Sequence, residues 1–147
     1  MKLIAVISAL SIFVASNVYA KCEGGSKTLF SCTTTKGKQI EVCDSGTTID
    51  YSFGKLKAKP EKIVKAPRSQ ASTSQWSGMG RYINYSIDIP TGNTTYNVFW
   101  AADKLSEQQD VEAGVNVIVN NKPAATVKCS GKNIVNNMEG VELKKSE

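Results

Sequence analysis

The chain has 147 residues, with 18 lysines and arginines against 13 aspartates and glutamates, 41% apolar residues and no histidine. This length fits one domain, and a charged fraction of 21% argues against wholesale disorder. The lack of histidine excludes Ser-His-Asp and Cys-His nucleophile pairs, histidine-ligated zinc and imidazole acid–base catalysis. Carboxylates alone suffice for glycoside cleavage, but no pattern places two of them in one cleft. We therefore expect a protein that is not an enzyme and uses no cofactor.

The first 20 residues have the pattern of a secretory signal peptide. Lys2 supplies a positive start, Leu3–Val14 is apolar, and the segment ends at Ala20 after a cleavage-site pattern of small and aliphatic residues. A membrane anchor is disfavoured because the apolar stretch is shorter than the roughly 20 residues that span a bilayer. Lys21 stands where lipid attachment would need a small residue. We expect a secreted or periplasmic, non-lipidated domain of residues 21–147 with no transmembrane segment.

The four cysteines, Cys22, Cys32, Cys43 and Cys129, form an even set in a chain predicted to be exported. Such a set favours two disulfides, whereas a four-thiolate metal site would need close Cys-x-x-Cys pairs. Of the three possible connectivities we prefer Cys32–Cys129 with Cys22–Cys43. The pairing Cys32–Cys43 across a hairpin is an open alternative. A bond to Cys129 would close a long loop and contribute about 3–5 kcal/mol of stability.

Alternation of apolar and polar residues predicts strands from the start of the mature chain. Thr28–Thr34 and Gln39–Cys43 flank a Lys-Gly-Lys turn and indicate a hairpin. Thr47–Phe53 follows as another strand, with apolar residues on one face.

A basic stretch, Lys55–Arg68, interrupts this pattern with six basic side chains against the single acid Glu61. With Ala66–Ser77 it is expected to form one long exposed loop. It could bind an anionic partner such as lipid phosphate. Its lack of aromatic residues disfavours single-stranded nucleic acid. We prefer the alternative of a solvated edge whose lysines prevent pairing between sheets.

Two further hairpins follow along the chain. Tyr82–Ile89 and Thr94–Ala102 alternate at period two around a turn rich in proline, glycine and asparagine. Val115–Val119 and Ala125–Cys129 do the same around an asparagine-rich turn.

Only Lys104–Asp110 and Ile134–Met138 are expected to form a helical turn or two. The total of seven or eight short strands predicts an all-β fold. We expect a small antiparallel barrel or sandwich stapled by two disulfides.

Acidic residues gather after the predicted strand that ends at Ala102. They are Asp103, Glu107, Asp110 and Glu112. Carboxylates are suitable ligands for Ca²⁺, but this spacing matches no calcium loop. We therefore expect a solvated connection between strands and no metal.

The segment Trp76–Tyr82 combines residue types that often dominate protein interfaces with two glycines, Gly78 and Gly80. Trp76, Arg81 and Tyr82 lie around these glycines, directly after the predicted polar loop. One interpretation is a recognition loop presented to a partner. The other is a β-bulge at the start of the next strand, with Trp76 beneath the rim of the barrel.

Several short motifs occur in a suggestive order: Phe30-Ser31-Cys32, Gly37-Lys38, the Ser77–Tyr82 loop, Tyr96-x-x-Phe99-Trp100 and Cys129. In this order they resemble the membrane-bound and periplasmic inhibitors of c-type lysozyme from bacteria, which are small antiparallel β-barrels. The chain is also similar to short exported bacterial proteins of unassigned function.

The resemblance implies a mode of action. These inhibitors place a loop serine and a lysine against the catalytic carboxylates of the lysozyme. The serine falls on Ser77. Ala101-Ala102 stands where the lysine would follow the Phe-Trp pair, and Lys104 is the nearest candidate.

We therefore expect an exported protein that binds a protein partner, and no nucleic acid, and blocks a wall hydrolase of the lysozyme type. The expected contact residues are Trp76, Ser77, Gly78, Gly80, Arg81, Tyr82 and Lys104. One alternative is an immunity-type or envelope-interaction protein that neutralises another periplasmic toxin. The other is a binder of anionic surfaces through Lys55–Arg68.

Overall fold

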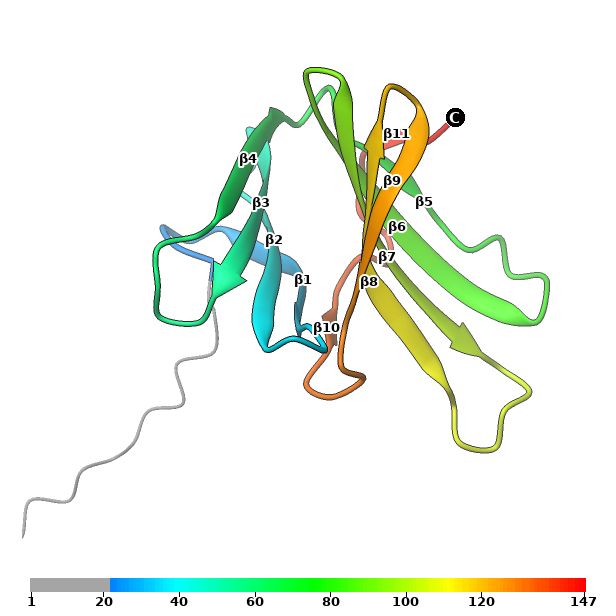
Figure 1. The fold of residues 1–147 in the computed structure, drawn as a ribbon. Helices are drawn as coiled ribbons and strands as arrows, with labels where there is room; N and C mark the ends of the chain where they lie inside the picture. Colours follow the sequence, from blue (N-terminus) through cyan, green and yellow to red (C-terminus); the bar gives the residue numbers. More distant parts are fainter. Residues whose placement is uncertain (1–21) are drawn as a thin grey trace, which may run out of the picture.

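The computed structural model describes residues 22–147, so the predicted signal peptide (residues 1–20) lies outside the described residues. Two β-sheets pack face to face, and no helix occurs among the residues described (Figure 1). The all-β prediction is confirmed. The sheets are not closed into one cylinder, so the sandwich is the correct one of the two predicted architectures.

Five strands make up the first sheet: β1 (Lys27–Thr33), β2 (Lys38–Asp44), β3 (Thr48–Lys55), β4 (Lys62–Pro67) and β10 (Val135–Asn136). Their order across the sheet is β10-β1-β2-β3-β4, and every neighbouring pair is antiparallel. The predicted hairpin around the Lys-Gly-Lys turn is therefore β1–β2, and the predicted third strand is β3.

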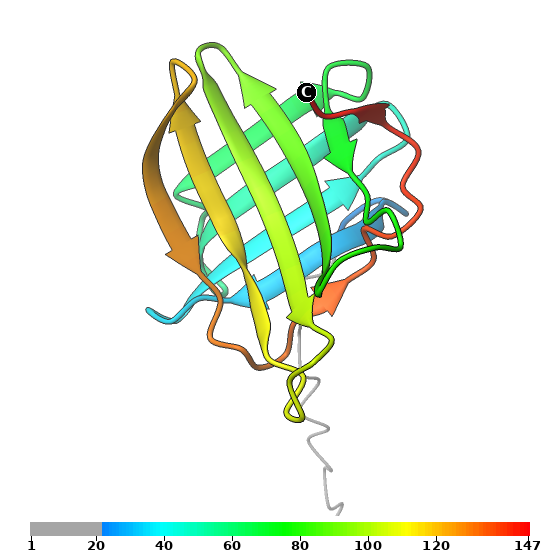
Figure 2. The same ribbon diagram turned by 90° about the vertical axis from the view of Figure 1, so that its right-hand side faces the viewer.

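Six strands make up the second sheet: β5 (Ser72–Ser74), β6 (Tyr82–Thr91), β7 (Thr94–Asp103), β8 (Val111–Val119), β9 (Lys122–Lys128) and β11 (Lys144–Lys145). Their order is β11-β5-β6-β7-β8-β9, and only β11 runs parallel to its neighbour. Figure 2 shows the strands of this sheet crossing in front of those of the first at a steep angle. Both hairpins predicted in this half are present.

The core lies between the two sheets and is built from the alternating apolar positions that the sequence displays. Tyr51 of β3 and Tyr96 of β7 stack across the interface with ring centres 4.7 Å apart. Fully buried apolar side chains come from both sheets and from the C-terminal segment: Leu29, Phe30, Ile40, Val42, Ile49, Ile87, Ile89, Val98, Val115 and Met138. Their burial is the main source of stability for such a fold.

Both preferred disulfides are present. Cys22 is bonded to Cys43, and Cys32 is bonded to Cys129, with Cα–Cα distances of 5.7 and 5.9 Å. The second bond joins β1 of the first sheet to the residue that follows β9 of the second. It spans 97 residues of sequence and therefore ties the two sheets together at one corner.

The prediction of one long exposed loop between residues 55 and 77 is wrong, because β4 and β5 lie inside it. In β4, Val64 and Ala66 are buried, whereas Ile63 and Lys65 are exposed. Only one face of this edge strand meets the core, so lysines are tolerated on the other. The many lysines in this segment favoured the prediction of a loop, although the two buried positions of β4 have the spacing of a strand.

Neither predicted helical turn is present. Residues 104–110 form an irregular connection of turns, and β10 lies within the second segment and pairs with β1. Segments this short do not nucleate a helix without strong support from packing. The free edge of β1 offers hydrogen-bond partners that favour the extended conformation instead.

Candidate functional site: an aromatic and basic tip

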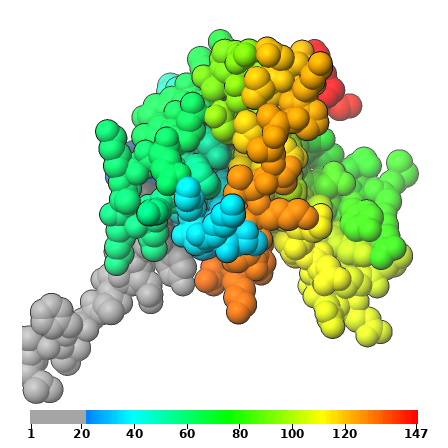
Figure 3. All heavy atoms as spheres, in the orientation of Figure 1, coloured from blue at the N-terminus to red at the C-terminus, as the bar shows by residue number. Residues whose placement is uncertain are grey.

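Two connections meet at the open end of the β6–β7 hairpin. Residues 75–81 enter β6, and residues 104–110 leave β7. The hairpin register places Tyr82 opposite Asp103, and the backbone N–H of Lys104 donates to the carbonyl of Arg81 at 3.1 Å. In Figure 3 these connections (green and yellow) project from one side of the molecule. We refer to residues 76–82 together with 103–105 as the tip.

An ion pair fixes the base of the tip. Arg81 Nε donates to both carboxylate oxygens of Asp103 at 2.9 and 3.0 Å, and Nη2 donates to Oδ2 at 2.6 Å. The hydrogen bonds from Arg81, joined by one from the backbone N–H of Leu105, lower the pKa of Asp103. Arg81 also lies over the ring of Tyr82, 5.4 Å from its centre. A forked arginine–carboxylate pair is directional, so it orients the neighbouring tyrosine.

Trp76 and Lys104 form the second contact across the tip. The ammonium group of Lys104 lies 4.9 Å from the centre of the Trp76 ring, within the range of a cation–π interaction. The indole N–H donates to the carbonyl of Met79 at 2.8 Å. Trp76 is half-buried and packs against the core, so it anchors the loop while one side of the loop faces solvent.

Gly78 and Gly80 have backbone φ angles of +87° and +94°. Residues with a Cβ rarely adopt this conformation. The two glycines therefore allow the chain to fold back so that the carbonyl of Met79 meets the indole of Trp76. This is the local reason for the Gly-x-Gly spacing.

The surface of the tip is unusually apolar for exposed loops. Met79 is 78% exposed, Leu105 is 74% exposed and Tyr82 is 51% exposed. Exposed methionine and aromatic residues next to arginine are typical of protein–protein contact surfaces. Ser77 is also exposed. The structure therefore gathers the seven residues predicted as a binding site into one region.

The alternative interpretation of this segment as a β-bulge does not describe it. The β6–β7 register is continuous from Tyr82–Asp103 to Thr91–Thr94. Trp76 is partly inside the fold, as that interpretation expected, but it lies in an irregular loop.

Sequence reasoning missed three members of the tip: Met79, Asp103 as the partner of Arg81, and Leu105. The signal that brings Asp103 to this end of the hairpin was available, although it does not identify Arg81 as its partner. Counting outward from the two-residue turn at Gly92-Asn93 pairs Tyr82 with Asp103. No comparable pattern identifies Leu105, because its exposure depends on the path of the loop.

Three of the four acidic residues considered for calcium have other partners. Asp103 binds Arg81, Asp110 accepts a hydrogen bond from Ser106 at 2.9 Å, and Glu112 lies 3.4 Å from Lys128. In the described part of the chain they do not form a cluster with metal-ligand spacing. Cys22, Glu41 and Cys43 are close enough to do so, but both sulfurs belong to one disulfide.

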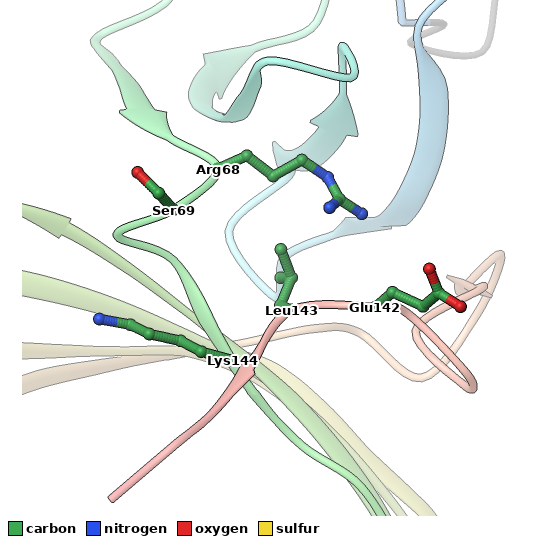
Figure 4. A pocket seen from close by; sticks show the side chains of 5 residues that line it. All are labelled: Arg68, Ser69, Glu142, Leu143 and Lys144. Carbon is green, nitrogen blue, oxygen red and sulfur yellow. The ribbon is translucent and has the colours of Figure 1, made fainter.

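Two shallow hollows lie elsewhere on the surface. One, of about 560 Å³, is lined by residues from the β4–β5 connection and the C-terminal segment, Arg68, Ser69, Glu142, Leu143 and Lys144 (Figure 4). Arg68 is held there by Asp44, with nitrogen–oxygen distances of 3.3 Å. The other, of about 510 Å³, lies beside Asp88 and the C-terminal residues. Neither contains a residue of the tip.

Comparison with known proteins gives no match to a family model, to a curated protein or to a solved structure. A search of residues 22–147 for a helix long and apolar enough to cross a bilayer finds none.

Proposed function

We propose that this chain is an exported binding protein that blocks a wall-degrading glycosidase of the lysozyme type with its tip. The observation that carries the proposal is the exposure of Met79, Tyr82 and Leu105 in the same two loops that hold Lys104, whose ammonium group lies over the ring of Trp76. Arg81 is neutralised by Asp103, whereas Lys104 has no ion-pair partner among residues 22–147. The tip therefore offers one cation outside any ion pair of the described residues, carried by loops that also expose apolar side chains.

This arrangement suits an enzyme whose cleft holds carboxylates. Glycoside hydrolases of most families act through a pair of Asp or Glu residues flanking the bond to be cleaved. An ammonium group inserted between them would gain charge-assisted hydrogen bonds in a site from which water is largely removed. The hydroxyl of Ser77, on the same loop as Trp76, would supply a further hydrogen bond.

The remaining features support export and binding. The two disulfides are consistent with an oxidising compartment. The pairs Arg81–Asp103 and Trp76–Lys104 hold the loops in place before a partner arrives, and such preorganisation reduces the entropy lost on binding.

A lysis assay tests the proposal. The exported, disulfide-bonded chain is mixed with a panel of lysozymes of different structural classes, and the lysis of bacterial walls is followed. We expect micromolar protein to inhibit at least one enzyme. Lys104→Glu should raise the inhibitor concentration needed by more than about tenfold, because charge reversal at a close contact between charges is costly. Lys122→Glu, the same change on the exposed β8–β9 hairpin, is the matched control and should inhibit like the unmodified chain.

Two results would contradict the proposal. One is full activity of every lysozyme in the panel, which would leave an immunity-type protein with another target as the better hypothesis. The other is equal inhibition by the Lys104→Glu and Lys122→Glu variants, which would place the contact surface away from the tip.

A further inference from the structure

The hairpin formed by the end of β3 and the start of β4 carries a second unusual surface. We refer to residues 55–65 as the lysine hairpin. All five of its lysines are exposed, and they are Lys55, Lys57, Lys59, Lys62 and Lys65. Figure 3 shows this region (blue-green) on the side of the molecule opposite the tip. Any role of the hairpin is therefore separate from the proposed inhibitory surface.

The positive charge of this hairpin is poorly compensated. Its one acid, Glu61, is already paired with Lys38 at 2.7 Å. Lys65 lies 3.8 Å from Asp50 but keeps 68% of its side chain exposed. Among the described residues no carboxylate lies within ion-pair distance of the other lysines of the hairpin.

Apolar side chains accompany these lysines. Leu56 is 50% exposed and Ile63 is 54% exposed, and both belong to the small group of large hydrophobic residues that the structure leaves in solvent. The loop between the strands is compact, because Glu61 N–H donates to the carbonyl of Phe53 at 2.8 Å and Ala58 N–H donates to that of Lys55 at 3.3 Å. The hairpin therefore presents cations and aliphatic groups together from an ordered turn.

Protection of a sheet edge explains only part of this surface. Lysine and proline on an edge strand prevent pairing with another sheet, and β4 is such a strand with Lys62, Lys65 and Pro67. This reason does not extend to the turn, which has no free edge to protect. Lys55, Lys57, Lys59 and Leu56 need another explanation.

We propose that the lysine hairpin binds the surface of an anionic lipid bilayer. Lysines near a membrane are attracted to anionic headgroups without a need for fixed geometry, and exposed aliphatic side chains can enter the boundary between headgroups and acyl chains. Leu56 and Ile63 are placed to do so while the ammonium groups lie among the phosphates. A nucleic acid fits less well, because residues 55–68 contain no aromatic side chain on which a base could stack.

Sedimentation with sucrose-loaded vesicles tests the proposal. The exported, disulfide-bonded chain is mixed with vesicles of phosphatidylcholine containing about a third phosphatidylglycerol, or of phosphatidylcholine alone, at low and high salt. We expect binding to the anionic vesicles only, weakening as salt screens the charges. Each lysine near the surface changes the partition coefficient about fivefold, so the triple variant Lys55→Gln, Lys57→Gln and Lys59→Gln should bind about 100-fold more weakly.

Two further variants separate the charge of the hairpin from net charge and from its apolar groups. Lys122→Gln, Lys132→Gln and Lys145→Gln together change the net charge equally at exposed positions elsewhere and should retain most of the binding. Leu56→Ser should weaken it about fivefold with all lysines intact.

Three results would overturn the proposal: equal loss of binding by the two triple variants, no effect of Leu56→Ser, or no binding to the anionic vesicles. A fourth result would also contradict it: the chain binds a single-stranded oligonucleotide through the same three lysines but does not bind the vesicles. The partner of the lysine hairpin would then be a nucleic acid and not a membrane. The variants leave the tip intact, so failure here does not affect the lysis assay.

Discussion

Arg81 and Asp103 form a forked ion pair that closes the open end of the β6–β7 hairpin, with Nη2 of Arg81 2.6 Å from Oδ2 of Asp103. The aspartate side chain is only 11% exposed, whereas 54% of the arginine side chain is exposed. Asp103 is therefore largely buried, and Arg81 extends from it towards solvent. This pair connects the two loops of the tip.

We expect Asp103→Asn to loosen the tip without unfolding the sandwich. Arg81 would lose its charged acceptor, and affinity for the partner should fall about tenfold because the contact surface is no longer preorganised. Binding measured by calorimetry, with circular dichroism to confirm the fold, tests this. Glu112→Gln, which removes the Lys128 contact on the same sheet, is the control. Equal affinity of both variants would mean that the ion pair has no part in binding.

The same pair predicts how the tip responds to acid. Because Arg81 lowers the pKa of Asp103, the folded state binds this proton less readily than the unfolded chain does. The contribution of the pair is complete above the ordinary aspartate pKa and is lost as pH falls through the lowered value. Tryptophan fluorescence, followed during acidification, should report a transition that Asp103→Asn abolishes. A transition of equal size in that variant would contradict this assignment.

The two disulfides should contribute unequally to stability. In the chain-entropy model the 97-residue separation of Cys32–Cys129 is worth about 4–5 kcal/mol, and the 21-residue separation of Cys22–Cys43 about 3 kcal/mol. Paired cysteine-to-serine variants, unfolded in urea, measure the difference. A larger loss of stability on removal of Cys22–Cys43 would show that the loop lengths do not govern their effect.

Two glycines, Gly54 and Gly114, have φ angles that are not positive. Of these we expect Gly114 of β8 to tolerate replacement by alanine less well. A Cβ added there would lie 2.2 Å from the carbonyl oxygen of Val127, whereas one at Gly54 would lie 2.9 Å from the nitrogen of Glu61. Overpacking of this kind costs about 1–3 kcal/mol. Urea unfolding of Gly114→Ala and Gly54→Ala should show the larger loss at Gly114. The reverse order would indicate that β9 moves away easily.

Glu41 of β2 should make stability decrease as pH rises. Burial, and secondarily the charge of Glu23, raise the pKa of Glu41, and its Oε2 is buried without a hydrogen-bond partner among residues 22–147. The folded state therefore holds this proton at a pH where the unfolded chain releases it, so stability is lost as pH rises through the raised pKa. Glu41→Gln should remove this decrease in urea unfolding, and Glu142→Gln on the surface should not. An unchanged pH profile in Glu41→Gln would refute the assignment.

The hairpins were predictable because apolar and polar residues mostly alternate along their strands, with irregularities near Leu29 and Ile118, and because their turns contain glycine or asparagine. In the β8–β9 turn, Asn120 and Asn121 have φ angles of +50° and +60°, the conformation that asparagine tolerates in tight turns. Strand β4 was missed because Val64 and Ala66 are its only buried residues and lysines surround them. The two-residue strands β10 and β11 form by pairing with β1 and β5, which are distant in sequence. No local pattern of residues predicts them.

The composition of the tip was predictable, but its geometry was only partly so. The combination of Trp76, Arg81 and Tyr82 around two glycines indicated a contact surface, and Lys104 was placed with it through the resemblance. The register of the hairpin brings Asp103 opposite Tyr82, but the ion pair with Arg81 depends on how the chain turns just before β6. The exposure of Met79 and Leu105 depends on how the two loops pack and could not be read from either loop alone.

Hydrogen exchange of the chain, alone and in complex with a lysozyme that it inhibits, tests the central claim most directly. We expect slower exchange on binding at the backbone amides of residues 76–82 and 103–105, with no change at the lysine hairpin or in β9. Protection elsewhere, with the tip amides exchanging as fast as in the free chain, would contradict the assignment of the tip as the contact surface.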